Sequence, residues 1–221
     1  MSQVSTLTKK KLTVRGQRTR LELLEAAEQV FGERGFEHSS ISEITRRAGV
    51  ALGTFYVYFP HKQAIFTELV DELGERLRET LNAASKDKTT RLEKERAGFR
   101  AFFEFAGKHR NLYRIVRQAE FVDAEVYHRY YKRLATSYSR GLTRAMQVKD
   151  IGTYDTEVIA YALMGIADFI GMRFVVWEDP AALERVTDEV VHFIQYGLLS
   201  PQRLGPLSGP LPASYGEGDK K

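Results

Sequence analysis

Residues 36–62 constrain the fold more than any other part of the sequence. Ser40 and Glu43 stand three residues apart in front of an apolar run, which is the spacing of a capping box at the start of a helix. Gly49 interrupts this run, and glycine readily takes the left-handed conformation of a tight turn. A second short helix follows and ends at Pro60. The segment therefore predicts a helix-turn-helix, whose second helix has the right size for the DNA major groove.

The same segment carries a resemblance to a known family. The pattern GV-x-x-GT-F-Y-x-YF-x-x-K, from Gly49 to Lys62, resembles the DNA-binding signature of TetR-family transcriptional regulators. The resemblance covers roughly the first 65 residues and says nothing residue-specific about the remainder. It implies an N-terminal three-helix DNA-binding domain, followed by a larger helical domain for effector binding and dimerisation.

Composition indicates a soluble globular protein. The chain has 221 residues, of which 43% are hydrophobic and 28% charged, and it has no cysteine. Disulfides and thiolate metal sites are therefore excluded, which fits a reducing cytoplasm. The first apolar run is short and interrupted by lysines, so no amino-terminal signal peptide is visible.

Positive charge is concentrated at the amino terminus. The net charge is +4, and residues 1–62 contain ten Lys or Arg against six Asp or Glu, so the rest of the chain is neutral overall. A basic terminus beside a DNA reader favours binding through counterion release. We therefore expect Lys9, Lys10 and Lys11 to belong to a DNA-contacting arm, with a merely solvated tail as the alternative.

Apolar periodicity predicts an all-α chain of about nine helices. Beyond the two short helices, the expected helices cover residues 17–34, 62–82, 91–109, 112–122, 123–148, 155–177 and 181–199. The expected organisation is a basic flexible arm (1–16), a helix-turn-helix domain (17–62), a helical effector-binding and dimerisation domain (63–200), and a flexible tail rich in proline and glycine (201–221).

The run from Val158 to Trp177 is long and apolar enough for a transmembrane helix. Asp168 and Arg173 lie inside it, however, and charges are expensive at membrane depth. A subunit interface explains the run better, because the last two helices of two chains can form a four-helix bundle. The resemblance implies the same dimer, with no membrane partner. The residues expected in this interface are Leu163, Ile166, Ile170, Val186, Val190, Phe193, Ile194 and Gly197.

The resemblance also assigns roles within residues 40–62. Tyr56 and Lys62 match phosphate-contacting positions, and Ser40 caps a helix whose first amides face the DNA backbone. The alternative for the two tyrosines of the second helix is packing in the small core. The full set expected to contact DNA is Lys9, Lys10, Lys11, Ser40, Ser42, Leu52, Gly53, Thr54, Tyr56, Val57, Tyr58, His61 and Lys62.

The second helix, ALGTFYVYF, lacks the side chains that make bidentate contacts with bases. Thr54 and the apolar groups can contact thymine methyl groups, which gives modest discrimination. We therefore expect specificity to depend on DNA shape and on the basic arm.

The middle of the chain is rich in aromatic residues, which pack in a core or line a pocket. Family resemblance favours a pocket for an apolar ligand. Asp168 is the charged residue most expected to orient the ligand, because a charge in an apolar helix needs a partner. A salt bridge across the dimer is its alternative role. The expected ligand-binding residues are Phe99, Phe102, Phe103, Arg117, Phe121, Tyr130, Tyr138, Asp168, Phe169 and Met172.

Two Glu-x-x-His pairs, Glu125/His128 and Glu189/His192, raise the possibility of a di-metal enzyme. Helical phase turns both pairs away from the apolar faces, and familiar catalytic motifs are absent from the sequence. We therefore expect no enzyme activity and no cofactor. The sequence predicts a homodimeric repressor that binds a palindromic DNA operator and is released by a small apolar or amphipathic effector. The alternatives are a DNA-binding protein without an effector and the di-metal bundle enzyme.

Overall fold

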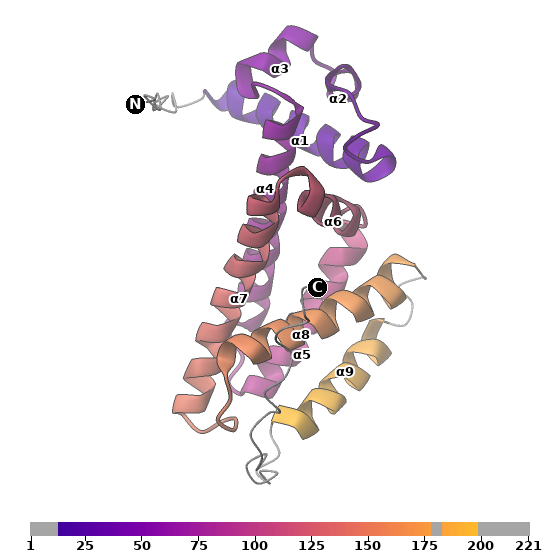
Figure 1. Cartoon of the computed structure of the whole chain (residues 1–221). Coiled ribbons are helices and arrows are strands. Elements are labelled where there is room, and N and C mark those ends of the chain that lie inside the picture. The colour runs from indigo at the N-terminus through magenta and orange to yellow at the C-terminus, as the bar shows by residue number, and fades with distance from the viewer. Residues whose placement is uncertain (1–12, 178–182, 199–221) are drawn as a thin grey trace, which may run out of the picture.

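A computed structural model describes residues 13–177 and 183–198, and every regular element in them is helical (Figure 1). This confirms the all-α prediction. The elements are α1 (Val14–Arg34), α2 (Ile41–Arg47), α3 (Leu52–Tyr58), α4 (Lys62–Ser85), α5 (Arg91–Lys108), α6 (Leu112–Val122), α7 (Ala124–Gln147), α8 (Thr156–Gly171), the π-helical turn η1 (Met172–Val176) and α9 (Leu183–Leu198).

The first helix begins earlier than its apolar periodicity predicts. Thr13 accepts a hydrogen bond from the Gly16 amide at 3.2 Å and so caps α1 before the apolar stripe starts. Residues 14–16, expected in the arm, are therefore helical. Lys9, Lys10, Lys11 and the predicted tail 201–221 lie outside the described residues.

The helix-turn-helix rests on a core that continues into the rest of the molecule. Phe31 on α1, Phe55 on α3 and Phe66 on α4 are fully buried, and the rings of Phe31 and Phe66 meet edge to face at 5.2 Å. The same cluster, which we call the upper core, extends along α4 to residues of α6 and α7. α4 thus descends from the helix-turn-helix into the lower half of the molecule (Figure 1).

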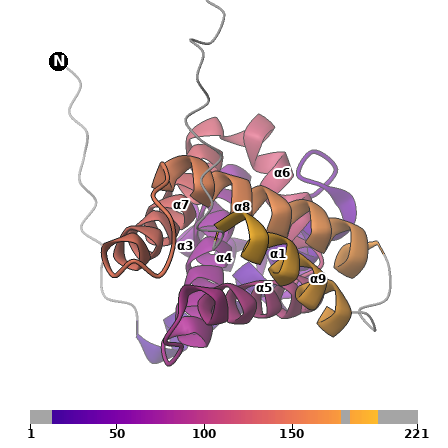
Figure 2. The same cartoon turned by 90° about the horizontal axis from the view of Figure 1, so that it is seen from below.

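A second cluster, the lower core, lies between α5, α7, α8 and α9 (Figure 2). Phe99 and Phe103 of α5 pack in it together with Leu142 of α7 and Ala160 of α8. From α9, which packs mainly on α5, the apolar stripe Val186, Val190 and Ile194 enters the same cluster. These three residues were predicted at a dimer interface, and in the structure their own subunit buries them.

The apolar run near the end of the chain is not one continuous α-helix. α8 ends at Gly171, and η1 follows with the wider turn of a π-helix. Among the described residues, Thr156–Val176 is the one helical run whose length and mean hydropathy of 1.7 would suffice to cross a membrane. It carries Asp168 and Arg173 and packs on α5 and α7. This packing supports the reading of the run as part of a helical domain.

Candidate DNA-reading surface and effector cavity

The turn between α2 and α3 is built as its sequence predicts. Ser40 accepts a hydrogen bond from the Glu43 amide at 3.2 Å and caps α2. Gly49 has a φ of 69°, the left-handed region that glycine occupies at little cost. The Glu43 carboxylate departs from the expected capping box, because it pairs with Nε of Arg34 at 2.8 Å and so ties α2 to α1.

α3 divides into a buried and an exposed side. Phe55 is completely buried, whereas Leu52 is 47% exposed, Tyr56 55% and Val57 73%. Gly53 is also exposed and has open space beside it. The exposed fraction of Tyr56 argues against simple core packing. Tyr58 is half-buried and packs against the upper core, so the packing alternative fits this tyrosine better.

Two of the predicted DNA contacts have structural roles inside the subunit. The Lys62 ammonium donates hydrogen bonds to the carbonyl oxygens of Phe36 at 2.6 Å and Ser39 at 3.0 Å, and lies 4.3 Å from the centre of the Phe36 ring. His61 caps α4 by accepting a hydrogen bond from the Ala64 amide at Nδ1, 3.1 Å away. In this conformation Lys62 ties the loop after α1 to α4.

A cavity of about 1170 Å³ lies below the helix-turn-helix, between α4, α5, α6, α7 and α8. Its walls combine apolar side chains of all five helices with a number of polar ones. Six of the ten predicted ligand-binding residues line it: Phe99, Phe102, Arg117, Tyr130, Tyr138 and Asp168.

The other four predicted ligand-binding residues lie elsewhere. Phe103 is completely buried in the lower core, whereas Phe121 is 87% exposed and Phe169 64% exposed. Met172 does not line the cavity, but its sulfur accepts a hydrogen bond from Arg117 at 3.0 Å. Leu163, predicted at the dimer interface, is buried and lines the cavity instead.

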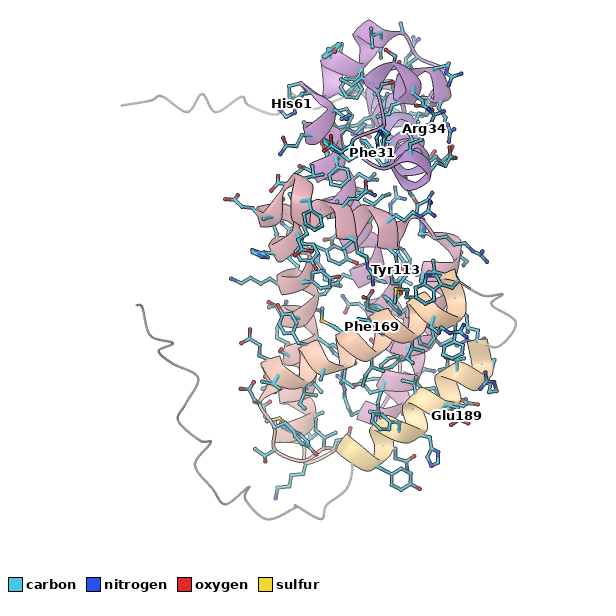
Figure 3. All side chains as sticks on the ribbon, turned by 45° about the vertical axis from the view of Figure 1, so that its right-hand side comes forward. Phe31, Arg34, His61, Tyr113, Phe169 and Glu189 are labelled. Atoms are coloured by element: carbon cyan, nitrogen blue, oxygen red, sulfur yellow. The ribbon has the colours of Figure 1, made fainter. Side chains whose placement is uncertain are left out.

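An oppositely charged pair of side chains lines the cavity between α6 and α8. Asp168 of α8 lies 3.9 Å from Arg117 of α6, measured from Oδ2 to Nη2. Burial raises the pKa of the Asp168 carboxyl, and the charge of Arg117 opposes this shift. Burial likewise raises the pKa of the hydroxyl of Tyr113, and the negative charge of Asp168 adds to this shift. Tyr113 lies close to α8 in Figure 3.

A second polar group lies among the residues that line the cavity. Nε of Arg91 donates to Glu95 at 2.6 Å, and both side chains are nearly completely buried. Tyr138 donates its hydroxyl to the same carboxylate. Burial raises the pKa of Tyr138, and the adjacent Glu95 adds to that shift. This group is internally satisfied and holds α5 to α7.

Apart from Arg117, the cationic residues of the cavity were not predicted from the sequence. Arg78 comes from the second half of α4, and Lys86 directly follows the end of this helix. Arg140 and Arg144 come from the last turns of α7. The two arginines stand four residues apart, which is the signal that places them on one helix face. With Lys94 of α5 they give the cavity a basic lining where α4, α5 and α7 meet.

Comparisons with known proteins agree with this architecture. The family model "Bacterial regulatory proteins, tetR family" matches residues 23–69, which span the helix-turn-helix. The HTH-type transcriptional regulator YdgC of Bacillus subtilis is 29% identical over 201 residues, covering 84% of this chain and 95% of the relative.

The chain belongs to the TetR family of transcriptional regulators.

Other relatives of this TetR-family chain have names that mention fatty acids. The fatty acid metabolism regulator of Bacillus subtilis is 36% identical over 74 residues, 34% of this chain and 38% of the relative. A Clostridium perfringens structure described as a fatty acid metabolism regulator is 25% identical, with a TM-score of 0.70, and the match covers 80% of this chain and 97% of that one. Bacillus subtilis FadR in complex with stearoyl-CoA shares the fold, with a TM-score of 0.71, 24% identity, and coverage of 79% and 96%.

In this TetR-family chain, α6 contacts both the cavity and the DNA-binding helices. Arg114 donates to the carbonyl oxygen of Gly32 on α1 at 2.9 Å. Gln118 accepts from the Phe36 amide at 2.5 Å. On its other side, the same helix contributes Tyr113 and Arg117 to the cavity. Helix α6 therefore connects the two sites directly.

An exposed apolar surface runs along α8 and α9. Val158, Tyr161 and Phe169 of α8 are 44–64% exposed, and Phe193 and Tyr196 of α9 about 70%. Glycines at 165 and 197 have open space beside them. We call this set the α8–α9 surface. Of the predicted dimer residues, Phe193 and Gly197 belong to it, and Ile166 and Ile170 are half-buried beside the lower core.

The two Glu-x-x-His pairs do not converge. Glu125 and His128 are exposed on α7, and Glu189 and His192 are exposed on α9, where Glu189 points outward (Figure 3). Within residues 13–177 and 183–198, no group of three or more potential ligands could hold a metal ion. The relatives of this chain are transcriptional regulators and not enzymes.

Proposed function

We propose that this TetR-family regulator is a cytoplasmic homodimeric repressor, which binds a palindromic operator and is released when an amphipathic effector enters its cavity. In this proposal residues 17–62 read DNA and residues 63–200 bind the effector and the second subunit. The observation that carries the proposal is that α6 lines the cavity and holds α1, so one helix contacts both the sensor and the reader.

The α8–α9 surface supports the homodimer. In the most apolar stretch of Thr156–Val176, only 28% of the residues are buried inside the subunit. A large apolar surface of this kind on a soluble protein marks an interaction site. Two copies related by a two-fold axis would bury it as a four-helix bundle and would present two α3 helices to one face of the DNA.

The lining of the cavity supports an amphipathic effector rather than a purely apolar one. Leu77, Leu81 and Phe99 provide apolar walls, whereas Arg140 and Arg144 provide positive charge. An apolar chain with an anionic head group satisfies both. The names of the fatty acid regulators and the stearoyl-CoA bound to one structural neighbour make an acyl chain the best candidate for the apolar part.

Release requires that the effector bind two states of the dimer with different affinities. The contacts of Arg114 with Gly32 and of Gln118 with Phe36 fix α1 relative to α6. An effector that displaces α6 would shift α1, and with it the helix-turn-helix. The tilt of α4, which runs from the reader along the cavity, would change the spacing of the two recognition helices.

The test begins with selection of bound sequences from random DNA duplexes by the purified full-length protein. The expected result is a palindromic consensus that the protein releases when stearoyl-CoA is added. A consensus that no acyl compound releases would favour the alternative of a DNA-binding protein without an effector. Equal binding to every duplex in moderate salt would contradict the proposal that the protein recognises a specific operator.

A further inference from the structure

The hydroxyl of Tyr113 is buried without a partner. Tyr113 is 7% exposed, and its oxygen makes no hydrogen bond within the part of the chain that the structure describes. A buried polar atom left unpaired costs free energy, so such atoms are rare in native proteins. Tyr113 also lines the cavity, which leaves a bound effector as the natural source of the missing partner.

The hydroxyl lies close to the backbone of α8 at Gly171. A Cβ atom added at Gly171 would lie 2.5 Å from the Tyr113 oxygen and 3.0 Å from the Phe102 ring. Glycine at this position therefore lets the tyrosine reach between α6 and α8. The π-helical turn begins at the next residue, and such turns occur frequently at functional sites.

The charged side chains that act on the hydroxyl form one pair of opposite sign. Asp168 and Arg117 are the charged groups that influence Tyr113, and they stand 3.9 Å from one another. A cationic group of a ligand would be repelled by Arg117, and an anionic group by Asp168. A neutral group that donates to the Asp168 carboxylate and accepts from Tyr113 meets both requirements, and a hydroxyl does so through a single oxygen atom.

We infer that the end of the cavity formed by Tyr113 and Asp168 binds a hydroxyl group on the acyl chain of the effector. This inference rests on the proposed function, and it narrows the effector from amphipathic acyl compounds to hydroxylated ones. The basic residues of the cavity then hold the anionic head, and the Tyr113–Asp168 end selects among chains of equal length.

The test compares stearate with its monohydroxylated isomers, each as the free acid and as the CoA thioester, below their micellar concentrations. Affinity for the full-length protein is measured by titration calorimetry. At least one hydroxylated isomer is expected to bind about tenfold more tightly than its parent, the gain of a pair of buried hydrogen bonds. Tyr113→Phe and Asp168→Ala should each remove most of this preference.

Tyr138→Phe is the matched control, since Tyr138 lines the same cavity but its hydroxyl already has Glu95 as a partner. This variant should keep the preference for the hydroxylated isomer. Loss of the preference in Tyr138→Phe, with retention in Tyr113→Phe, would show that the hydroxyl of the ligand binds near Tyr138 and not near Tyr113. That result would overturn the inference.

The melting temperature of the free protein gives a second readout. Tyr113→Phe removes a hydroxyl that has no partner, so the effector-free variant should melt no lower than the wild type. A clear loss of stability would show that the hydroxyl is already satisfied in the free protein, which contradicts the inference.

The two proposals fail in different ways. If parent and hydroxylated compounds bind equally and release DNA equally, the Tyr113–Asp168 inference is overturned while the proposed function stands. If no compound of the series binds, the acyl effector is overturned together with the inference, and operator binding is judged separately by the selected duplexes.

Discussion

Lys62 shows how a single side chain can hold together the part of the molecule that reads DNA. Its ammonium donates hydrogen bonds to two carbonyl oxygens of the loop between α1 and α2, those of Phe36 and Ser39. The ring of Phe36 packs against Phe31 and Phe66 of the upper core. The geometry of the loop thus depends on a lysine that the family resemblance would assign to a DNA phosphate.

Replacing Lys62 with methionine should therefore destabilise the protein. The carbonyl oxygens would lose a charged donor, which lowers the free energy of unfolding by about 1.5 to 3 kcal/mol. Urea denaturation measures the change, with Lys132→Met as the control because Lys132 is exposed on α7. Unchanged stability with weaker, less salt-dependent DNA binding would instead show that Lys62 contacts phosphate.

Asp168 should make stability depend on pH in a defined direction. Burial raises its pKa above the ordinary value of 3.8, so the folded state holds the proton more tightly than the unfolded state. Stability then falls as the pH rises through the window between 3.8 and the raised pKa. The stability of Asp168→Asn relative to the wild type should increase through that window and then level off. Thermal denaturation of the effector-free proteins measures this difference. If the difference in stability between Asp168→Asn and the wild type stayed constant from pH 3 to 8, the raised pKa of Asp168 would be contradicted.

Residues with a local physical role were the most predictable from the sequence. Ser40 and Gly49 could be assigned because a cap and a left-handed turn depend on neighbouring residues alone. Asp168 stood out as a charge in an apolar run. Tyr113 could not be singled out, because its importance comes from the missing partner of its hydroxyl, which depends on how α6 packs against α8.

At the scale of elements, α6 is the part of the molecule that both sites share. Arg114 donates a hydrogen bond to α1, and Gln118 accepts one from the Phe36 amide in the loop after α1. Gln63 of α4 donates to the carbonyl oxygen of Val122 at the end of α6, at 3.2 Å. One side of α6 is thus fixed to the DNA-binding half, while its other side lines the cavity through Tyr113 and Arg117. A small shift of this helix would therefore change both the shape of the cavity and the position of the DNA-binding helices.

Removing the hydrogen bonds between α6 and the DNA-binding half should weaken the effect of the effector on operator binding. In Gln118→Ala with Arg114→Met, α6 loses its two hydrogen bonds to the end of α1, so a ligand can move α6 without moving the reader. Effector affinity should change less than about threefold, because neither residue lines the cavity. The effector concentration that releases half of the DNA should rise severalfold in a gel-shift titration. An equal response in variant and wild type would show that coupling runs through α4 alone.

The direction that α9 faces could not be predicted from periodicity. Val190 and Ile194 form an aliphatic face and Phe193 and Tyr196 an aromatic one, so the helix has two candidate faces. Packing on α5 buries the aliphatic face and leaves the aromatic one outside. The sequence therefore predicts an apolar helix, but periodicity alone does not show that α5 of the same subunit covers its aliphatic face.

For the whole molecule, the α8–α9 surface makes a specific prediction about assembly. Phe169→Lys should give a monomer at micromolar concentration, because a lysine at the centre of an apolar interface would be buried without a partner. Phe121→Lys is the matched control, since Phe121 is even more exposed but lies on α6. Sedimentation velocity measures both. A dimer in Phe169→Lys together with a monomer in Phe121→Lys would show that the interface lies at α6 and not on the α8–α9 surface, which would contradict the prediction.

The central claim is that the exposed face of α3 meets DNA twice in each dimer. Hydroxyl-radical footprinting of the wild-type protein on its selected operator tests it most directly. The predicted result is two protected segments, related by the two-fold axis of the site and separated by about one turn of DNA, or about 10 base pairs. Stearoyl-CoA should remove both together. A single protected segment, or protection that persists unchanged in Val57→Asp, would contradict the account.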